Sequence, residues 1–409
     1  MSQFVAALAI AALASPLPAE GAAPGADGTS WTVHAKAVYT STGQVLENAA
    51  VVVQDGKIRA ITPGIVAPRG ALEVEAVTAG FVEAGSRIHD GFFSVEQSTE
   101  VQPQRAIADS LDPFDVRWKR LADSGVTTAY VAPLERNVIG GQGLAVKTAG
   151  EPTVAARTVP GRGYVTGVIG SLPSSGNSPA FGRPTSFYNR RPTTRMGVEW
   201  EWRKAFFDAV AAKRIPEREF DGAAQLRQVL AGELGLYITA WATQDIRTAI
   251  FLKEELAREG FGTVQLVIEA AAEAWKEPKL LVRSGAAVIL PPFPDQGRTQ
   301  DQSFMPLDAA KQVADLGVPF ALSAQDARDP GARMAAQAGF AMRGGLTREQ
   351  ALVAVTLTPA RILGIDARVG SIEVGKDADL VLWNGAPFEA TSGIVGVLVG
   401  GALVKDPRP

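Results

Sequence analysis

The chain has 409 residues, of which 46% are hydrophobic and 20% charged, and its formal net charge is −3 at pH 7. These values are typical of a soluble globular protein, with a length that allows one large barrel domain or two to three ordinary domains. The absence of Cys excludes a disulfide framework and a thiolate site, two His residues are few for a zinc site, and no basic stretch suggests nucleic-acid binding.

The first residues predict export. An apolar run over residues 5–14 ends in an A-x-A pattern, as in a secretory signal peptide, although no Lys or Arg precedes it. The alternatives are an apolar N-terminal helix or a start codon placed too late. We expect a signal peptide over 1–15, a linker over 16–28 and a periplasmic or extracellular location. The run is too short to be a stable membrane anchor.

Both ends of the remaining chain have a strand pattern. Strands are expected at 31–39, 49–54, 57–61, 379–383 and 394–404. Asp55-Gly56, between the second and third of these, predicts a tight hairpin. We therefore expect one small β-sandwich domain, built from 29–75 and 367–409.

The middle of the chain alternates between apolar strands and helices. Apolar runs without polar alternation, as in parallel strands buried on both faces, lie at 76–84, 127–132, 236–240, 264–269, 286–290 and 318–323. The clearest helical pattern covers 244–258, with Ile246, Ala249 and Ile250 on one face. This alternation predicts a (β/α) barrel or a doubly wound sheet, and a β domain made from both ends favours a barrel over 76–366.

Four segments resemble a known family. They are AVTAGFVEAGSRIH (76–89), GVTTAYVAP (125–133), TPARILG (358–364) and VGSIEVGKDADLV (369–381). The first is similar to the first barrel strand of the amidohydrolase superfamily, P-G-[LF]-[IV]-D-x-H-x-H, and the second to a strand of its imidazolonepropionase-like branch. The resemblance covers nearly everything from about residue 30. It implies a (β/α)8 TIM-type barrel with a β-sandwich, and an active site at the carboxyl ends of the strands.

The sequence departs from the family at those strand ends. The resemblance places four metal-binding histidines and one carboxylate at Gly85, Arg87, Thr239, Ala270 and Gln325. The last strand reads Ser323-Ala-Gln-Asp326, so Asp326 reaches the carboxylate position only if the register shifts by one. This chain therefore resembles a degenerate member that lacks the metal-ligand histidines.

These replacements predict loss of the metal. A catalytic zinc needs about three ligands at about 2.0–2.2 Å, and Gly and Ala offer no ligand atom. Arg87 stays protonated at any working pH, so it repels a dication and is expected to pair with Asp326, Glu83 or Glu269. We expect no cofactor, neither zinc nor another divalent metal.

Three residues remain as catalytic candidates. His89 is either a general base or ligand contact beside the site, or a packing or surface histidine. Lys147 is either the bridging lysine of some amidohydrolases or an ordinary strand-end lysine. Asp326 belongs to a charged cluster over 326–333, which is either a salt-bridged loop at the barrel mouth or part of a ligand pocket. Residues 171–192 are either a surface insertion or a lid.

The sequence thus predicts an amidohydrolase-like pseudoenzyme. It is expected to bind a small molecule in the barrel pocket or to act as a subunit in a hetero-oligomer with an active amidohydrolase paralogue. The alternative is a hydrolase of non-peptide C–N bonds, acting either by metal-independent chemistry through Arg87, His89, Lys147 and Asp326 or by ordinary metal-dependent hydrolysis.

Overall fold

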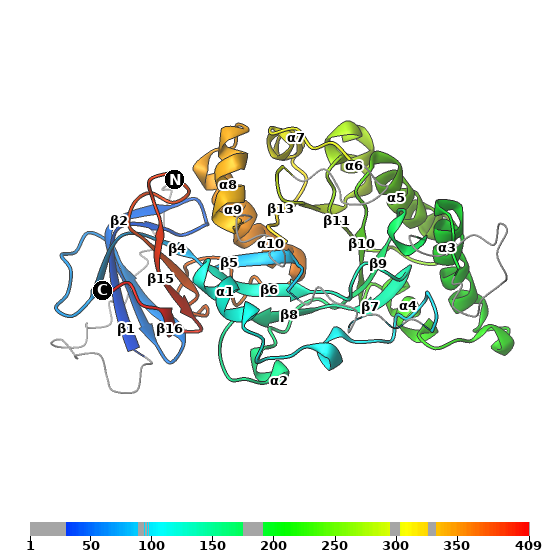
Figure 1. The fold of residues 1–409 in the computed structure, drawn as a ribbon, viewed down its shortest axis with the longest axis horizontal. Coiled ribbons are helices and arrows are strands. Elements are labelled where there is room, and N and C mark those ends of the chain that lie inside the picture. Colours follow the sequence, from blue (N-terminus) through cyan, green and yellow to red (C-terminus); the bar gives the residue numbers. More distant parts are fainter. Residues whose placement is uncertain are drawn as a thin grey trace, which may run out of the picture.

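The computed structural model describes residues 30–88, 94, 96, 98–174, 191–294, 303–325 and 333–408. The molecule is elongated, with a sheet at one end and a group of strands surrounded by helices in the rest (Figure 1). The expected signal peptide and linker lie outside the described residues. Within the described part, no helix is long and apolar enough to cross a membrane.

Both chain ends contribute to one seven-stranded sheet with the order β16-β15-β14-β4-β1-β2-β3. The strands are β1 (Ser30–Tyr39), β2 (Val45–Gln54), β3 (Lys57–Thr62), β4 (Leu72–Ala79), β14 (Leu380–Trp383), β15 (Ile394–Val399) and β16 (Ala402–Lys405). Asp55 and Gly56 have φ angles of 51° and 74°, so the predicted hairpin is confirmed. A two-sheet sandwich was expected. Instead, β4 pairs with both β1 and β14 and joins the two ends into a single sheet.

Gly80 separates this end sheet from the rest of the chain. The expected strand over 76–84 is broken there, with β4 before it and β5 (Phe81–Ser86) after it. A Cβ atom on Gly80 would lie 2.2 Å from Oγ1 of Thr127, so the close approach of the two segments requires glycine. The boundary expected after residue 75 therefore lies at Gly80.

The middle of the chain forms two more sheets, of three strands in the order β5-β6-β8 and of six in the order β13-β12-β11-β10-β9-β7. The further strands are β6 (Val126–Val131), β7 (Ile139–Gln142), β8 (Leu144–Lys147), β9 (Tyr164–Val168), β10 (Gly235–Thr239), β11 (Leu266–Glu269), β12 (Ala287–Leu290) and β13 (Phe320–Leu322). The β5–β6 pair and the run from β9 to β13 are parallel, whereas β7 and β8 are antiparallel to their neighbours.

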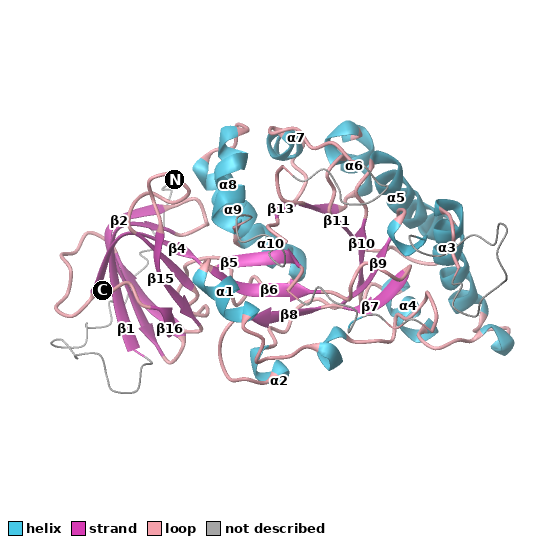
Figure 2. Ribbon diagram, viewed as in Figure 1, coloured by secondary structure: helices cyan, strands magenta, loops and turns pink. Residues whose placement is uncertain are grey.

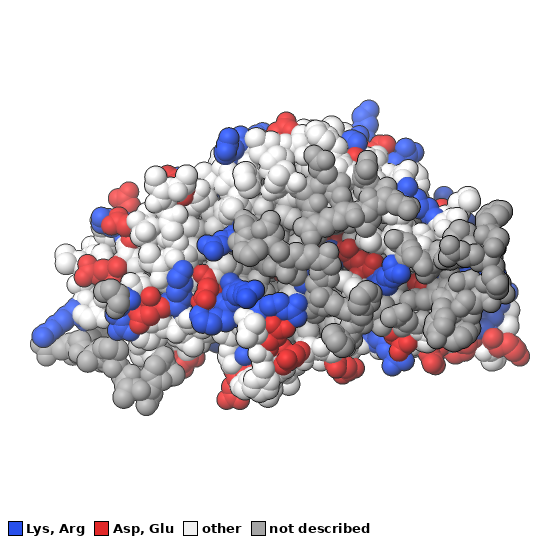
Figure 3. All heavy atoms as spheres, in the orientation of Figure 1, with Lys and Arg blue, Asp and Glu red and all other residues white. Residues whose placement is uncertain are grey.

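Helices lie outside these strands (Figure 2). They are α1 (Arg117–Asp123), α2 (Val154–Arg157), α3 (Arg195–Ala211), α4 (Ala223–Leu230), α5 (Thr243–Arg258), α6 (Pro278–Ser284), α7 (Ala309–Asp315), α8 (Met334–Arg343), α9 (Arg348–Val355) and α10 (Leu357–Leu363). The predicted helix over 244–258 is α5, which buries Ile246, Ala249 and Ile250 as expected. On the face shown in Figure 3, acidic and basic side chains are interspersed.

The arrangement is TIM-barrel-like, but the hydrogen-bond ladder is not closed among the described residues. β7 and β8 follow one another through Gly143 and belong to different sheets, so the chain passes there from one sheet to the other. On the opposite side β5 lies beside β13 without strand pairing in the described part. The expected (β/α)8 barrel is thus seen as a TIM-barrel-like arrangement of two sheets, which strand pairing does not close among the described residues.

Lys147, at the end of β8, joins the two parts of the molecule. Its Nζ lies 2.5 Å from Oδ2 of Asp379 and 3.1 Å from Oδ2 of Asp377. Both aspartates are buried, and Asp377 also pairs with Lys57 and Arg368. Burial tends to raise the pKa of Asp377, but the surrounding cations outweigh it and hold that pKa below its usual value.

Replacing Lys147 should weaken this joint. Lys147→Met leaves Asp379 buried without a counterion, so the free energy of unfolding should fall by about 3–5 kcal/mol in urea titrations at pH 7. Lys119, exposed and paired with Asp123, offers a matched control. Its replacement by Met should change that free energy by about 0.5 kcal/mol or less. Equal effects of the two substitutions would contradict the structural role of Lys147.

The cluster of Lys147, Asp377 and Asp379 also predicts that the free energy of unfolding depends on pH. A carboxyl group whose pKa is lower in the folded state stabilises the fold above its unfolded value, about 3.9 for Asp, and this contribution is lost as the pH falls through the folded pKa. Because the pKa of Asp377 is lowered, the free energy of unfolding should drop below about pH 4. In urea titrations between pH 7 and pH 2, the free energy of unfolding should fall less for Lys147→Met than for the wild type. An equal fall in both proteins would show that Lys147 does not cause the lowered pKa of Asp377.

Candidate functional site

The carboxyl ends of four strands bring together the positions at which the family resemblance predicts metal ligands. Gly85 lies in β5, Arg87 just after it, Thr239 at the end of β10, Ala270 after β11 and Gln325 after β13. A Cβ atom on Gly85 would lie 3.2 Å from Oε1 of Glu269 and 2.8 Å from Oγ of Ser323. The site is therefore tightly packed where β5 meets β11 and β13.

Glu269 is the centre of this site. Its side chain is 1% exposed, and Nη2 of Arg87 lies 2.9 Å from Oε1, so Glu269, one of the three expected acids, pairs with Arg87. The hydroxyl of Thr239 donates to Oε2 at 2.8 Å, and the side-chain amide of Gln325 donates to Oε1 at 2.9 Å. Three of the five expected metal-ligand positions therefore supply hydrogen-bond donors to one buried carboxylate.

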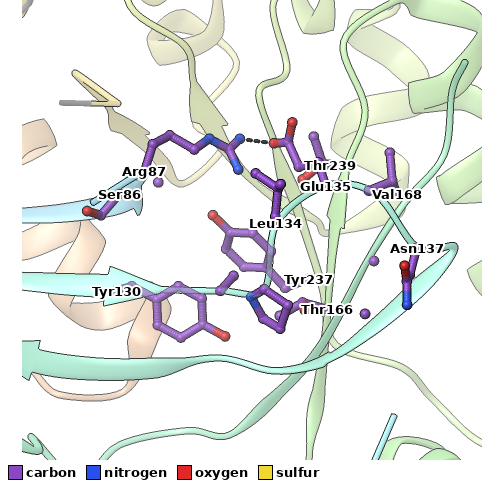
Figure 4. A pocket seen from close by; sticks show the side chains of 15 residues that line it. Ser86, Arg87, Tyr130, Leu134, Glu135, Asn137, Thr166, Val168, Tyr237 and Thr239 are labelled. Carbon is purple, nitrogen blue, oxygen red and sulfur yellow. Dashed lines mark ion pairs between the residues drawn. The ribbon is translucent and has the colours of Figure 1, made fainter. Parts of the chain in front are cut away.

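A second carboxylate reaches Arg87 from a loop. Glu135, between β6 and β7, forms an ion pair with the Arg87 guanidinium (Figure 4). Both side chains are 15% exposed, so this pair lies at the outer edge of the site. Sequence reasoning missed Glu135 because it belongs to no strand or helix pattern. Its position shortly after a buried strand is the one signal that the sequence offers.

Glu83 is a third buried carboxyl group, and it does not pair with Arg87. Its Oε1 accepts hydrogen bonds from the Gly85 amide and the Ser323 hydroxyl, and its Oε2 from the Ala324 amide. Burial raises the pKa of Glu83 although these hydrogen bonds lower it, and the charge of Glu269 raises it further. Glu83 thus links β5 to the end of β13, where the two strands are not paired.

Two residues of the site have left-handed backbones. Ala270 has a φ of 55° and Gln325 a φ of 47°, which is uncommon for residues other than glycine. Such conformations cost on the order of 1–3 kcal/mol each and persist where the surrounding structure requires them. Ala270 directly follows β11 and Gln325 is the third residue after β13, and at Gln325 the side chain reaches Glu269.

Three tyrosine rings fill the interior next to the site. Tyr130, Tyr164 and Tyr237 pack together in the interior, with ring centroids 5.1–6.2 Å apart. The Tyr237 hydroxyl donates to the carbonyl of Ala84 at 2.8 Å, whereas the buried Tyr130 hydroxyl has no hydrogen-bond partner in the described protein. Burial raises the pKa of Tyr130 and Tyr237, so both stay neutral. The interior is therefore packed and not an open channel.

A small pocket remains beside Tyr130 and Tyr237 (Figure 4). Its lining is Gly85, Ser86, Arg87, Tyr130, Ala132, Pro133, Leu134, Glu135, Asn137, Gly140, Thr166, Gly167, Val168, Tyr237 and Thr239. Its free volume is about 10 Å³, which is close to the space that one water molecule needs. In this conformation the pocket is therefore filled by its own side chains.

Of the other predicted candidates, the structure describes Lys147, and it is not brought to this pocket. Lys147 lies in the joint with Asp377 and Asp379. His89 and Asp326 lie outside the described residues, as does most of the proposed lid over 171–192. Across the described part of the chain, no group of three or more His, Asp or Glu side chains has an arrangement that could hold a metal ion.

The hydrogen bond from Thr239 gives a direct test of this geometry. Thr239→Val keeps the shape but removes the donor to buried Glu269, so the free energy of unfolding should fall by about 1.5–3 kcal/mol in urea titrations. Thr248 is the control, because its exposed hydroxyl bonds only a carbonyl of its own helix. Thr248→Val should have an effect of about 0.5 kcal/mol or less. A loss at Thr239 no larger than at Thr248 would contradict the hydrogen-bond network.

Comparisons with known proteins agree with this fold. The amidohydrolase family model matches residues 307–404. The amidohydrolase tasK of Hapsidospora irregularis is 24% identical over 76% of this chain and 34% of its own length, and the imidazolonepropionase of Pseudomonas aeruginosa (strain UCBPP-PA14) is 62% identical over 10% of each chain. The chain thus spans about a third or less of the length of these curated relatives.

Solved structures are similar over nearly the whole chain. An amidohydrolase from Thermotoga maritima MSB8 is 28% identical, with a TM-score of 0.78 over 91% of this chain and all of that one. A zinc-bound adenosine deaminase from Xanthomonas campestris is 17% identical, with a TM-score of 0.51 over 92% of this chain and 93% of that one, and shows a likeness of fold alone. These neighbours imply a TIM-barrel-like α/β fold.

Proposed function

We propose that this amidohydrolase-like protein is a pseudoenzyme that binds no catalytic zinc and holds a small ligand at the barrel mouth. The observation that carries the proposal is the position of Arg87. Its guanidinium pairs with buried Glu269 at a place where the family resemblance predicts a metal-binding histidine. A permanent protein cation thus supplies the positive charge that Glu269 needs.

The residues at the five predicted positions do not fit a zinc ion. Gly85 and Ala270 offer no side-chain atom that could ligate a metal. The Thr239 hydroxyl and the Gln325 side-chain amide already donate hydrogen bonds to Glu269. At an effective dielectric constant of 20, two unit charges about 4 Å apart repel by roughly 4 kcal/mol, and a dication beside Arg87 by about twice that.

The two buried carboxyl groups of the site also offer little for metal-independent hydrolysis. Glu83 is enclosed by hydrogen bonds from Gly85, Ser323 and Ala324, so it has no path to a substrate. Glu269 is similarly held by its three donors. A general base must lie within hydrogen-bond reach of the group from which it takes a proton, and neither carboxyl group faces open space. Binding is therefore the function that this geometry supports best.

Metal analysis and an activity panel test the proposal together. After incubation with excess zinc and desalting, elemental mass spectrometry should find well below one zinc ion per chain. A panel of amides and lactams should show no turnover above buffer. One zinc ion per chain, together with zinc-dependent turnover, would overturn the proposal.

Metal-independent hydrolysis would give a different result. Turnover that persists in chelator and disappears in the double variant Arg87→Met/Glu269→Gln would favour the alternative enzyme. The double variant removes the charges of Arg87 and Glu269 together, so Glu269 is not left as a buried carboxylate without its cation. Arg227→Met, which removes a surface partner of Glu219, is the matched control and should behave as the wild type in both assays.

A further inference from the structure

The two carboxylates on Arg87 are held very differently. Glu269 accepts hydrogen bonds from Arg87, Thr239 and Gln325 and is buried. Glu135 lies in the loop that follows β6, and in the described structure Arg87 is the partner that holds its side chain. Figure 4 shows Glu135 reaching the guanidinium from the side opposite the strand that carries Arg87. Glu269 is thus a fixed counterion, whereas Glu135 can be exchanged.

The loop around Glu135 is anchored through its neighbours. The Leu134 amide donates to Oγ of Ser94 at 3.2 Å, and the side-chain amide of Asn137 donates to the carbonyl of Glu96 at 2.7 Å. Because these contacts do not involve the Glu135 carboxylate, its side chain can leave Arg87 by a change of rotamer alone. Its partial exposure gives it a path to solvent.

The space that Glu135 would vacate has a definite chemistry. Leu134 and Val168 form an apolar wall, and the hydroxyls of Ser86 and Thr166 lie among the lining groups. Tyr130 also lines the pocket, and its buried hydroxyl has no partner in the described protein. With the Glu135 carboxylate in place, the free volume of about 10 Å³ admits no organic ligand. Movement of Glu135 frees the volume of one carboxylate group directly at the guanidinium.

We propose that Arg87 binds the carboxylate of a short-chain organic acid, and that Glu135 occupies this subsite until the ligand replaces it. This inference rests on the proposed function, since it requires Arg87 and not a metal at the barrel mouth. A guanidinium and a carboxylate form charge-assisted hydrogen bonds with matching planar geometry. The exchange replaces one such pair with another and leaves the charge on the guanidinium balanced throughout.

Glu135 competes with a free carboxylate for Arg87, and this competition determines the affinities that we expect for the wild type and for Glu135→Ala. A tethered carboxylate acts at a high effective concentration, so the wild type should bind a free carboxylate weakly. Glu135→Ala removes the competitor and opens the pocket, while Arg87 keeps its pair with Glu269 and the fold is retained. The dissociation constant for acetate should therefore be at least tenfold lower in Glu135→Ala than in the wild type.

The test is a titration with sodium acetate at constant ionic strength, followed by NMR of the Arg87 side-chain N–H group. The wild type should give a weak, saturable shift and Glu135→Ala a tighter one. Acetamide, the neutral analogue, should give no shift in either protein. Acetate should also protect Glu135→Ala, but not a folded Arg87→Met/Glu269→Gln variant, against thermal unfolding. Glu219→Ala, which removes a surface carboxylate paired with Arg227, should bind acetate as the wild type does.

Two results would overturn the inference. Equal affinities of wild type and Glu135→Ala would show that Glu135 does not compete. Binding by Glu135→Ala alone would show that Glu135 is a permanent part of the site. Either result in protein shown to be free of zinc would leave the proposed function intact, whereas stoichiometric zinc would overturn both.

Discussion

The ion pair between Arg87 and Glu269 is the interaction on which the packing of the strand ends around the site depends. A carboxylate that is 1% exposed requires a cation or a proton, because an isolated buried charge costs several kcal/mol. Arg87 supplies that cation, and Thr239 and Gln325 supply the remaining hydrogen bonds. Each of these donors comes from a different strand end, so the pair also fixes how β5, β10, β11 and β13 meet.

Glu83, two tyrosine rings and Glu135 surround this pair. Glu83 links β5 to the residues after β13 through two hydrogen bonds, where no strand pairing joins the described residues. The rings of Tyr130 and Tyr237 fill the interior beneath it. Glu135 covers it from the loop after β6. The guanidinium therefore lies between a packed interior and the carboxylate of Glu135, which we propose is exchanged for that of a ligand.

Much of the fold was predictable because its physical causes are local. Buried parallel strands such as β10 and β12 are apolar runs without alternation, and the Asp55-Gly56 turn has the residues that its left-handed backbone needs. In contrast, β7 was missed because two of its four residues are glycines, which carry no strand signal. The break at Gly80 was missed because the sequence is apolar on both sides of it, and only the nearby Thr127 shows why a glycine is needed.

The site was predictable in part for a different reason. The family resemblance located Arg87 and the strand ends, and the need of a guanidinium for an acid gave Glu269 as one of three expected partners, beside Glu83 and Asp326. Glu135 was not predictable, because a loop residue is placed by the path of the chain and not by a periodic pattern. The packing of the three tyrosine rings and the left-handed backbone of Gln325 likewise depend on how distant strands meet.

In the described structure the guanidinium of Arg87 balances the charge of Glu269, and we propose that no metal takes its place. A double-mutant cycle between Arg87→Met and Glu269→Gln measures the coupling free energy of the pair directly. We expect about 2–3 kcal/mol, with the same value in excess zinc and in excess chelator. A coupling that is present in chelator and disappears in zinc would show that a metal displaces Arg87, and would contradict the account.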